Sequence, residues 1–310
     1  MYCPICFSEK TKSIFKNTAI DIERDVMFCE DCNLFFVFPL PAADELDRFY
    51  KKEWSWEYGL DEKSSIIRKI FHFIHEAHQK FIARERANYL YKLAPNQMTN
   101  ILEVGSGSGA FLREIAKYYK FVQGIEPSLE EEYITEKFKI KRETIDDSLI
   151  IDDQYDVICM YMVLEHLANP IKILNILKNG LKTGGRLIIE VPFSPYKEYE
   201  SLDEFELSKV FENVHLFHFS RKNVECLSKE LAMTLDDFKV IQKMEFIKGY
   251  NVFAIYPNSS RRGLGYKFIS LFNLLILYAR GLVRLSIHKS VDEFKTKFGD
   301  GFWVRFVLKK

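Results

Sequence analysis

The pattern of apolar and polar positions divides the chain into three parts. The first part ends at an apolar run, residues 34–38, which Pro39 and Pro41 close. Between residues 64 and 93 apolar side chains recur every three or four positions, which predicts a long helix. From residue 100 onward, short β-type runs alternate with helical patterns, as in a parallel sheet built from right-handed β–α units. We therefore expect a small N-terminal module, a helical linker and a large α/β domain.

The third part predicts seven strands and four helices. The strands are expected at 101–104, 121–126, 140–145, 155–161, 186–191, 238–247 and 302–308. The helices are expected at 110–119, 128–138, 170–181 and 221–231. The module would then occupy residues 1–40, the helical linker and cap 41–98, and the α/β domain 99–310. The run 301–309 has the pattern of a closing antiparallel strand, so residues 259–301 are expected to form an insertion before it.

Composition and charge narrow the class of protein. Of the 310 residues 47% are hydrophobic, enough for a substantial core, which excludes long disordered tracts. Lys and Arg number 44 and so do Asp and Glu, so no basic excess favours a phosphate backbone and no nucleic-acid partner is expected. We find no pattern of a secretory signal, and the apolar stretch 268–279 is too short to cross a bilayer. These features predict a cytoplasmic protein.

Four of the six cysteines form two Cys-x-x-Cys pairs, Cys3 with Cys6 and Cys29 with Cys32. Two residues between thiolates let both sulfurs reach one ion, and two such knuckles complete a tetrahedron around Zn²⁺. Disulfide or redox chemistry is the alternative, and a reducing compartment disfavours it. Because sulfur would take all four positions, the predicted zinc is structural and leaves no place for a reacting water.

A glycine-rich loop follows the first strand of the α/β domain. Gly105, Gly107 and Gly109 permit a tight turn and a close approach of backbone N–H groups to a ligand. Glu103 precedes them and would repel a pyrophosphate, whereas it suits the ammonium of a methionine-derived cofactor. Glu126 ends the next strand, where a carboxylate can accept hydrogen bonds from both ribose hydroxyls. Together these residues predict a site for an adenosyl cofactor.

Several tracts carry a family resemblance. Residues 155–170 contain Leu-Glu-His-Leu at 164–167, residues 184–192 contain Gly-Gly-Arg-Leu-Ile-Ile-Glu-Val-Pro, and residues 215–220 contain His-Leu-Phe-His-Phe-Ser. With the glycine loop and the cysteine pairs, the chain resembles the class I S-adenosylmethionine-dependent methyltransferases that carry an N-terminal four-cysteine zinc module.

The resemblance implies an α/β fold with a seven-stranded Rossmann-like methyltransferase sheet and a small N-terminal zinc knuckle module. It also implies that Glu103 and the three glycines hold the methionine half of S-adenosyl-L-methionine, that Glu126 holds the ribose, and that Thr144, Ile145 and Asp146 border the adenine. Tyr161 is expected to border the cofactor. Some relatives carry a further acid before the Glu-His pair, and Met160 and Met162 occupy that stretch here, which argues against a catalytic magnesium site.

Methyl transfer to a hydroxyl or an acidic C–H needs an aligned acceptor and usually a base. His215 is our first candidate for the base or for acceptor contact, because it lies in the long connection where an acceptor would enter. His166 is the second candidate, its alternative being a helix-start residue bonded to the backbone. His218 alternates with Phe217 and Phe219, which favours packing.

The neutral chain fits a small-molecule acceptor, and relatives of this type indicate a sugar nucleotide, glycan or natural-product precursor methylated on oxygen or carbon. One alternative is an RNA methyltransferase with a zinc module, but acids outnumber bases in the first forty residues. Another is a noncatalytic adenosyl-binding scaffold.

The predicted insertion is basic. Residues 261–310 hold eleven Lys and Arg against three acids, and within them 264–285 combine an apolar run with Lys267, Arg280 and Arg284. Such a helix can lie at an anionic membrane surface, which predicts a location peripheral to the inner face of the membrane or contact with a lipid-linked acceptor. The alternative is an apolar helix packed on its own domain or in a dimer.

Overall fold

The computed structural model describes residues 1–19, 22–42, 44–46, 48, 66–145, 149, 151, 154–193, 215–242 and 302–310. The predicted insertion at 259–301, with its basic apolar segment 264–285, lies outside these residues. Asp146 and the end of the strand predicted at 238–247 also lie outside them.

The central sheet contains eight strands within the described ranges, in the order β11-β12-β9-β8-β4-β5-β7-β6. β4 pairs in parallel with β5 and β8, β5 with β7, and β8 with β9, whereas β12 lies antiparallel between β9 and β11. The strand bounds are β4 Asn100–Val104, β5 Phe121–Ile125, β6 Tyr133–Ile134, β7 Lys139–Lys141, β8 Tyr155–Tyr161, β9 Leu181–Pro192, β11 Thr234–Gln242 and β12 Phe302–Lys309. The strand order reverses beside β4, and ligands of open α/β sheets bind at the carboxyl ends of strands at such a point.

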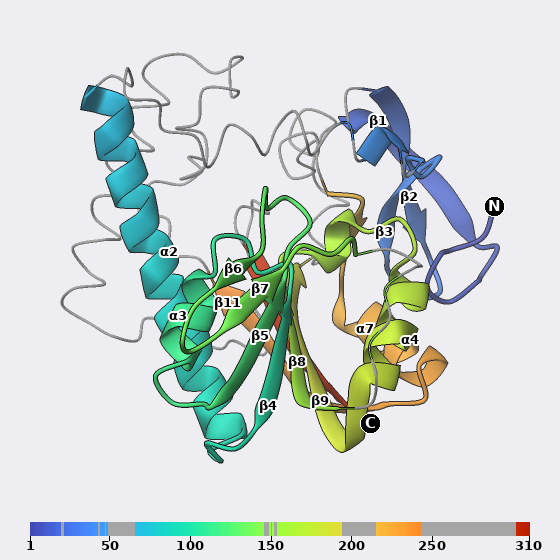
Figure 1. Cartoon of the computed structure of the whole chain (residues 1–310). Helices are drawn as coiled ribbons and strands as arrows, with labels where there is room; N and C mark the ends of the chain where they lie inside the picture. Colours follow the sequence, from blue (N-terminus) through green and yellow to red (C-terminus); the bar gives the residue numbers. More distant parts are fainter. Residues whose placement is uncertain are drawn as a thin grey trace.

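Two layers of helices cover this sheet (Figure 1). α2 (Ile66–Leu93) and α3 (Ala110–Ile115) lie on one side, and α4 (Pro170–Gly180) and α7 (Arg221–Glu230) lie on the other. α4 begins with a proline, whose fixed φ suits a first turn, and the Ser220 hydroxyl caps α7 by accepting the N–H of Asn223. The predicted helices at 170–181 and 221–231 are therefore confirmed, while α3 ends four residues earlier than predicted.

The helix predicted at 128–138 is wrong. In its place β6 runs antiparallel to β7, so the sheet has eight strands in the described residues instead of the predicted seven. The reversal is made at Thr135, whose hydroxyl accepts the N–H of Phe138 and donates to its carbonyl. This local side-chain bonding gives the backbone an alternative to a helix, and helical periodicity alone does not reveal it.

The N-terminal residues form a separate antiparallel sheet. β1 (Thr11–Ala19) pairs with β2 (Ile22–Cys29), and β2 pairs with β3 (Phe35–Phe38). Its fourth strand, β10 (Phe217–His218), comes from the far end of the α/β domain and pairs with β3. One buried core cluster runs from Cys3, before this sheet, and Phe28 of β2 to Phe306 of the central sheet. The two sheets are thus joined by main-chain hydrogen bonds and by shared core.

No helix in the described part combines the length and the apolar character needed to span a bilayer.

Candidate functional site

The glycine loop connects β4 to α3 with a backbone that requires glycine. Gly105, Gly107 and Gly109 have φ values of 75°, 50° and 76°, in the left-handed region that side chains disfavour. A Cβ on Gly105 would lie 2.3 Å from Cγ2 of Val163, in the segment after β8. The loop is thereby packed against the residues that lead to the Leu-Glu-His-Leu tract.

Glu126 lies directly after β5 and is buried. Its Oε2 accepts the backbone N–H of Gly107 at 2.7 Å, and its Oε1 accepts the backbone N–H and the hydroxyl of Ser128 at 3.0 and 2.7 Å. The carboxylate therefore ties the end of β5 to the glycine loop after β4. Its backbone N–H donates to the Lys141 carbonyl at the end of β7, which brings a third strand end beside it.

Glu103 lies within β4, just before the loop, and is buried. Burial raises its pKa well above the usual value, and the nearby charge of Arg86 only partly opposes this. Among the described residues its Oε2 has no hydrogen-bond partner. A buried carboxylate oxygen is costly to leave unsatisfied, so the site is suited to a cationic group.

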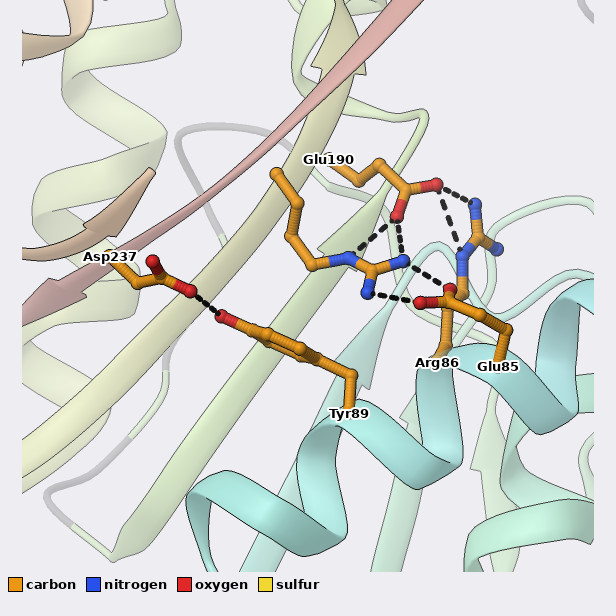
Figure 2. A network of polar contacts seen from close by, with 6 residues as sticks. Glu85, Arg86, Tyr89, Glu190 and Asp237 are labelled. Carbon is orange, nitrogen blue, oxygen red and sulfur yellow. Dashed lines mark hydrogen bonds and ion pairs between the residues drawn. The ribbon is translucent and has the colours of Figure 1, made fainter. Parts of the chain in front are cut away.

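A buried network of ion pairs lies near the same edge of the sheet. Arg86 of α2 donates to Oε1 of Glu190 at 2.6 and 3.2 Å, and Arg305 donates to Oε2 of Glu190 at 2.6 and 2.9 Å. Arg305 also forms two hydrogen bonds to Glu85. Figure 2 shows Glu85 and Arg86 of α2 facing Glu190 across the helix–sheet contact. Burial acts to raise the pKa of Glu190, but the two guanidinium charges outweigh it and lower this pKa to about 2.

Tyr161, at the end of β8, is buried and contacts Arg86 of this network. The Arg86 guanidinium lies 4.3 Å from the centroid of its ring, a cation–π distance. Burial raises the pKa of its phenol well above the usual value. The three residues predicted to border the adenine follow β7: Thr144 is exposed, Ile145 is half-buried, and Asp146 lies outside the described residues.

The structure brings the two predicted histidines together. His166 ends a 3₁₀ turn (η1, Leu164–His166) after β8, and His215 lies just before β10. Their ring centroids are 5.1 Å apart, and a hydrogen bond from the Leu216 N–H to the Glu165 carbonyl, 2.8 Å long, fixes the two segments side by side. Burial of the His215 ring lowers its pKa to about 4, so this imidazole is neutral near pH 7. His218, 5.8 Å from His215 between ring centroids, is buried.

Glu165 is the residue of this group to which sequence reasoning gave no role. Its side chain is 0% exposed, and burial raises its pKa to about 8. Its Oε1 lies 3.8 Å from Nε2 of His166. The available signal was a glutamate flanked by Val163, Leu164 and Leu167 directly after an apolar strand, because a carboxyl group buried without a partner is unfavourable.

The four predicted cysteines also meet. The Sγ atoms of Cys3 and Cys32 are 3.6 Å apart and those of Cys6 and Cys29 are 3.5 Å apart, and all four lie within 4.8 Å of one another. Four sulfurs at about 2.3 Å from one Zn²⁺ form a tetrahedron with edges of about 3.8 Å, whereas a disulfide requires about 2.05 Å. Each knuckle is followed by a residue with positive φ, Phe7 or Asn33, which turns the chain back. The donor set and its spacing fit zinc.

Comparison with known proteins places these observations in context. Residues 66–231 match the family model described as a methyltransferase domain. A putative methyltransferase from Bacillus halodurans is 13% identical with a TM-score of 0.50, covering 72% of this chain and 98% of that one. The YcgJ protein from Bacillus subtilis is 15% identical with a TM-score of 0.49, covering 72% and 97%. At 13% identity the likeness to the Bacillus halodurans protein shows the fold alone. No curated protein sequence matches this chain.

Proposed function

Because this chain belongs to the methyltransferase domain family, we propose that it transfers the methyl group of S-adenosyl-L-methionine to a small-molecule acceptor. One observation supports this most directly: Glu103, two residues before the glycine loop, has a buried oxygen without a hydrogen-bond partner among the described residues, while Glu126 accepts the N–H of Gly107 in that loop from the end of the next strand. An ammonium group and a ribose are the two parts of the cofactor that such carboxylates bind.

In this proposal the side chain of Glu103 binds the ammonium group of the methionine half. The backbone of Gly105, Gly107 and Gly109 approaches the carboxylate of the same methionine half. Glu126 receives the ribose hydroxyls. Thr144, Ile145 and Asp146 border the adenine, and Tyr161 borders the methionine end. The positive end of α3, which begins after Gly109, favours an anionic group at the loop.

The transfer itself is an in-line displacement. A lone pair of the acceptor forms a bond to the methyl carbon while the C–S bond breaks and its electron pair stays on sulfur. The protein supplies alignment, exclusion of water and a place for the acceptor's proton. We assign acceptor contact to His215 with His166 beside it. The low pKa of His215 keeps its lone pair available but makes it a weak base, which fits an acceptor O–H or C–H that is already acidic.

We further propose that Cys3, Cys6, Cys29 and Cys32 hold one structural Zn²⁺. The ion would cross-link the two knuckles and supply folding energy to the small N-terminal sheet. The sulfurs complete its coordination, so the ion takes no part in methyl transfer.

The acceptor class we favour is a sugar nucleotide, glycan or natural-product precursor, methylated on oxygen or carbon. The test is incubation of the protein with isotopically labelled S-adenosyl-L-methionine and a panel of sugar nucleotides, glycolipids and RNA, followed by mass analysis. We expect label in a small molecule. Label in RNA would replace this acceptor class with nucleic acid, and binding of NAD in preference to the sulfonium cofactor would reject the proposal.

A further inference from the structure

Glu165 carries a buried carboxyl group that the described residues do not satisfy. Its side chain is 0% exposed, and neither Oε1 nor Oε2 has a hydrogen-bond partner among them. Buried charged or polar groups are normally paired, hydrogen-bonded or bound to a metal, since an unsatisfied one is costly. A buried and unsatisfied carboxyl group at the carboxyl edge of the sheet therefore indicates a bound ligand that supplies the missing contacts.

Two imidazoles lie beside this carboxyl group. One donor atom from each of Glu165, His166 and His215 lies within 4.8 Å of the other two, and the pair Glu165 Oε1 and His166 Nε2 is 3.8 Å apart. The three residues come from segments about 50 positions apart, held together by the Leu216 N–H to Glu165 carbonyl hydrogen bond. The cluster is therefore part of the fold and is separate from the four-cysteine cluster.

We propose that Glu165, His166 and His215 bind one divalent transition-metal ion. Donors at about 2.1 Å from an ion lie about 3.0–3.4 Å apart, so small rotations of the half-buried histidine rings suffice to close the site. Two nitrogens and one carboxylate oxygen favour ions such as Zn²⁺, Mn²⁺ or Fe²⁺ over Mg²⁺, which prefers oxygen ligands. Three protein donors leave coordination positions open, as in catalytic rather than structural sites.

The position of the site indicates what the open positions bind. Val163, two residues before Glu165, lies against Gly105 of the glycine loop. If the proposed function holds, an acceptor oxygen on the ion would lie on the side where the methyl donor sits. Coordination acidifies a hydroxyl, so its proton passes to solvent water, the oxygen bonds to the methyl carbon, and the electron pair of the broken C–S bond stays on sulfur. The oxidation state of the ion does not change, and His215 then acts as a ligand instead of a base.

The experiment uses the full chain loaded with zinc at the cysteines and titrated with Mn²⁺, which thiolate sites bind poorly. Electron paramagnetic resonance measures free Mn²⁺. We expect one bound equivalent, and we expect Glu165→Gln and His215→Gln each to weaken binding by at least about tenfold. Glu225→Gln, an exposed glutamate on α7, is the matched control and should bind Mn²⁺ like the wild type.

Binding of S-adenosylhomocysteine by each variant shows that it is folded and tests the cofactor site separately. Mn²⁺ binding without cofactor binding would keep the metal site and reject the proposed function. Cofactor binding with no Mn²⁺ or Co²⁺ bound at about 1 mM would overturn the metal site and leave the proposed function standing. Equal Mn²⁺ affinity of the wild type and Glu165→Gln would also overturn it.

Discussion

The backbone N–H of Gly107 donates a 2.7 Å hydrogen bond to Oε2 of Glu126. This contact joins the ends of two neighbouring parallel strands, β4 and β5, at the edge where ligands of such sheets bind. Because Glu126 also accepts two hydrogen bonds from Ser128, its carboxylate is held in one orientation before any cofactor arrives. A preorganised anion of this kind binds hydroxyl groups with little further loss of side-chain entropy.

We predict that Glu126→Ala weakens binding of S-adenosylhomocysteine by about 1.5–3 kcal/mol, the usual loss for charge-assisted hydrogen bonds. Isothermal titration calorimetry measures the change. Glu225→Ala, which alters an exposed ion pair on α7, is the control. Unchanged affinity of Glu126→Ala would reject the ribose assignment. Glu190 is unsuitable as a reference, because its removal would leave Arg86 and Arg305 buried without their shared anion.

The lowered pKa of Glu190 predicts that the stability of the folded protein depends on pH. Its pKa falls from the usual 4.5 to about 2 because Arg86 and Arg305 outweigh the effect of burial. Because this pKa is lower in the folded than in the unfolded protein, the ionised carboxyl group adds about 3 kcal/mol to the free energy of unfolding above the unfolded-state pKa. This contribution is lost as the pH falls towards 2. Glu190→Gln should therefore unfold at lower urea concentration than the wild type near pH 7, with a gap that narrows by about pH 3.5. A gap of constant size at both pH values would contradict this.

Local motifs and long-range contacts differ in how far the sequence alone reveals them. The glycine loop and the cysteine pairs could be found in the sequence because each is a local motif, and β8 begins and ends as its apolar run predicts. The partnership of Arg305 with Glu190 joins positions 115 apart, and no local pattern encodes it. The placement of Glu165 beside His215 brings together two distant segments of the chain, so no local pattern reveals it either. The hairpin at β6 was missed because one threonine side chain decides that turn.

For the catalytic step we predict that His215→Ala lowers turnover by about 10²-fold or more while affinity for the cofactor stays near that of the wild type. The ring lies beside His166, 5.1 Å away between ring centroids, whereas the glycine loop is held by Glu126. Steady-state kinetics with the acceptor and calorimetry with the cofactor measure the two effects separately. Unchanged turnover would reassign His215 to packing.

The basic segment 264–285 lies outside the described residues, and we propose that it contacts an anionic membrane surface. Its Lys267, Arg280 and Arg284 flank an apolar run. Segments that combine basic and apolar residues in this way bind at the interface between an anionic membrane and water. Sedimentation with anionic liposomes should recruit the protein at low salt and release it at high salt. Arg280→Glu combined with Arg284→Glu should reduce recruitment. A wild-type protein that stays in the supernatant at low salt would assign the segment to core or dimer packing.

The zinc module should influence turnover more than cofactor affinity. The Val37 N–H of β3 donates to the Leu216 carbonyl, and the Leu216 N–H donates to Glu165, so β3 holds the segment that carries His215. The Ser220 hydroxyl and the Asn223 amide also donate to the carbonyls of Cys32 and Asn33. Cys32→Ser, which loosens the second knuckle, should therefore displace His215, whereas the glycine loop is held from β5.

The measurement compares zinc content, S-adenosylhomocysteine affinity and turnover of Cys32→Ser with those of Cys226→Ser, a half-buried cysteine on α7 outside the cluster. We expect Cys32→Ser to lose zinc and most turnover but to keep cofactor affinity within about threefold, because only the acceptor side of the site depends on β3. Wild-type turnover in a zinc-free Cys32→Ser protein would show that β10 keeps its position without the metal. Less than half an equivalent of zinc in the wild type would reject the metal assignment for the four cysteines.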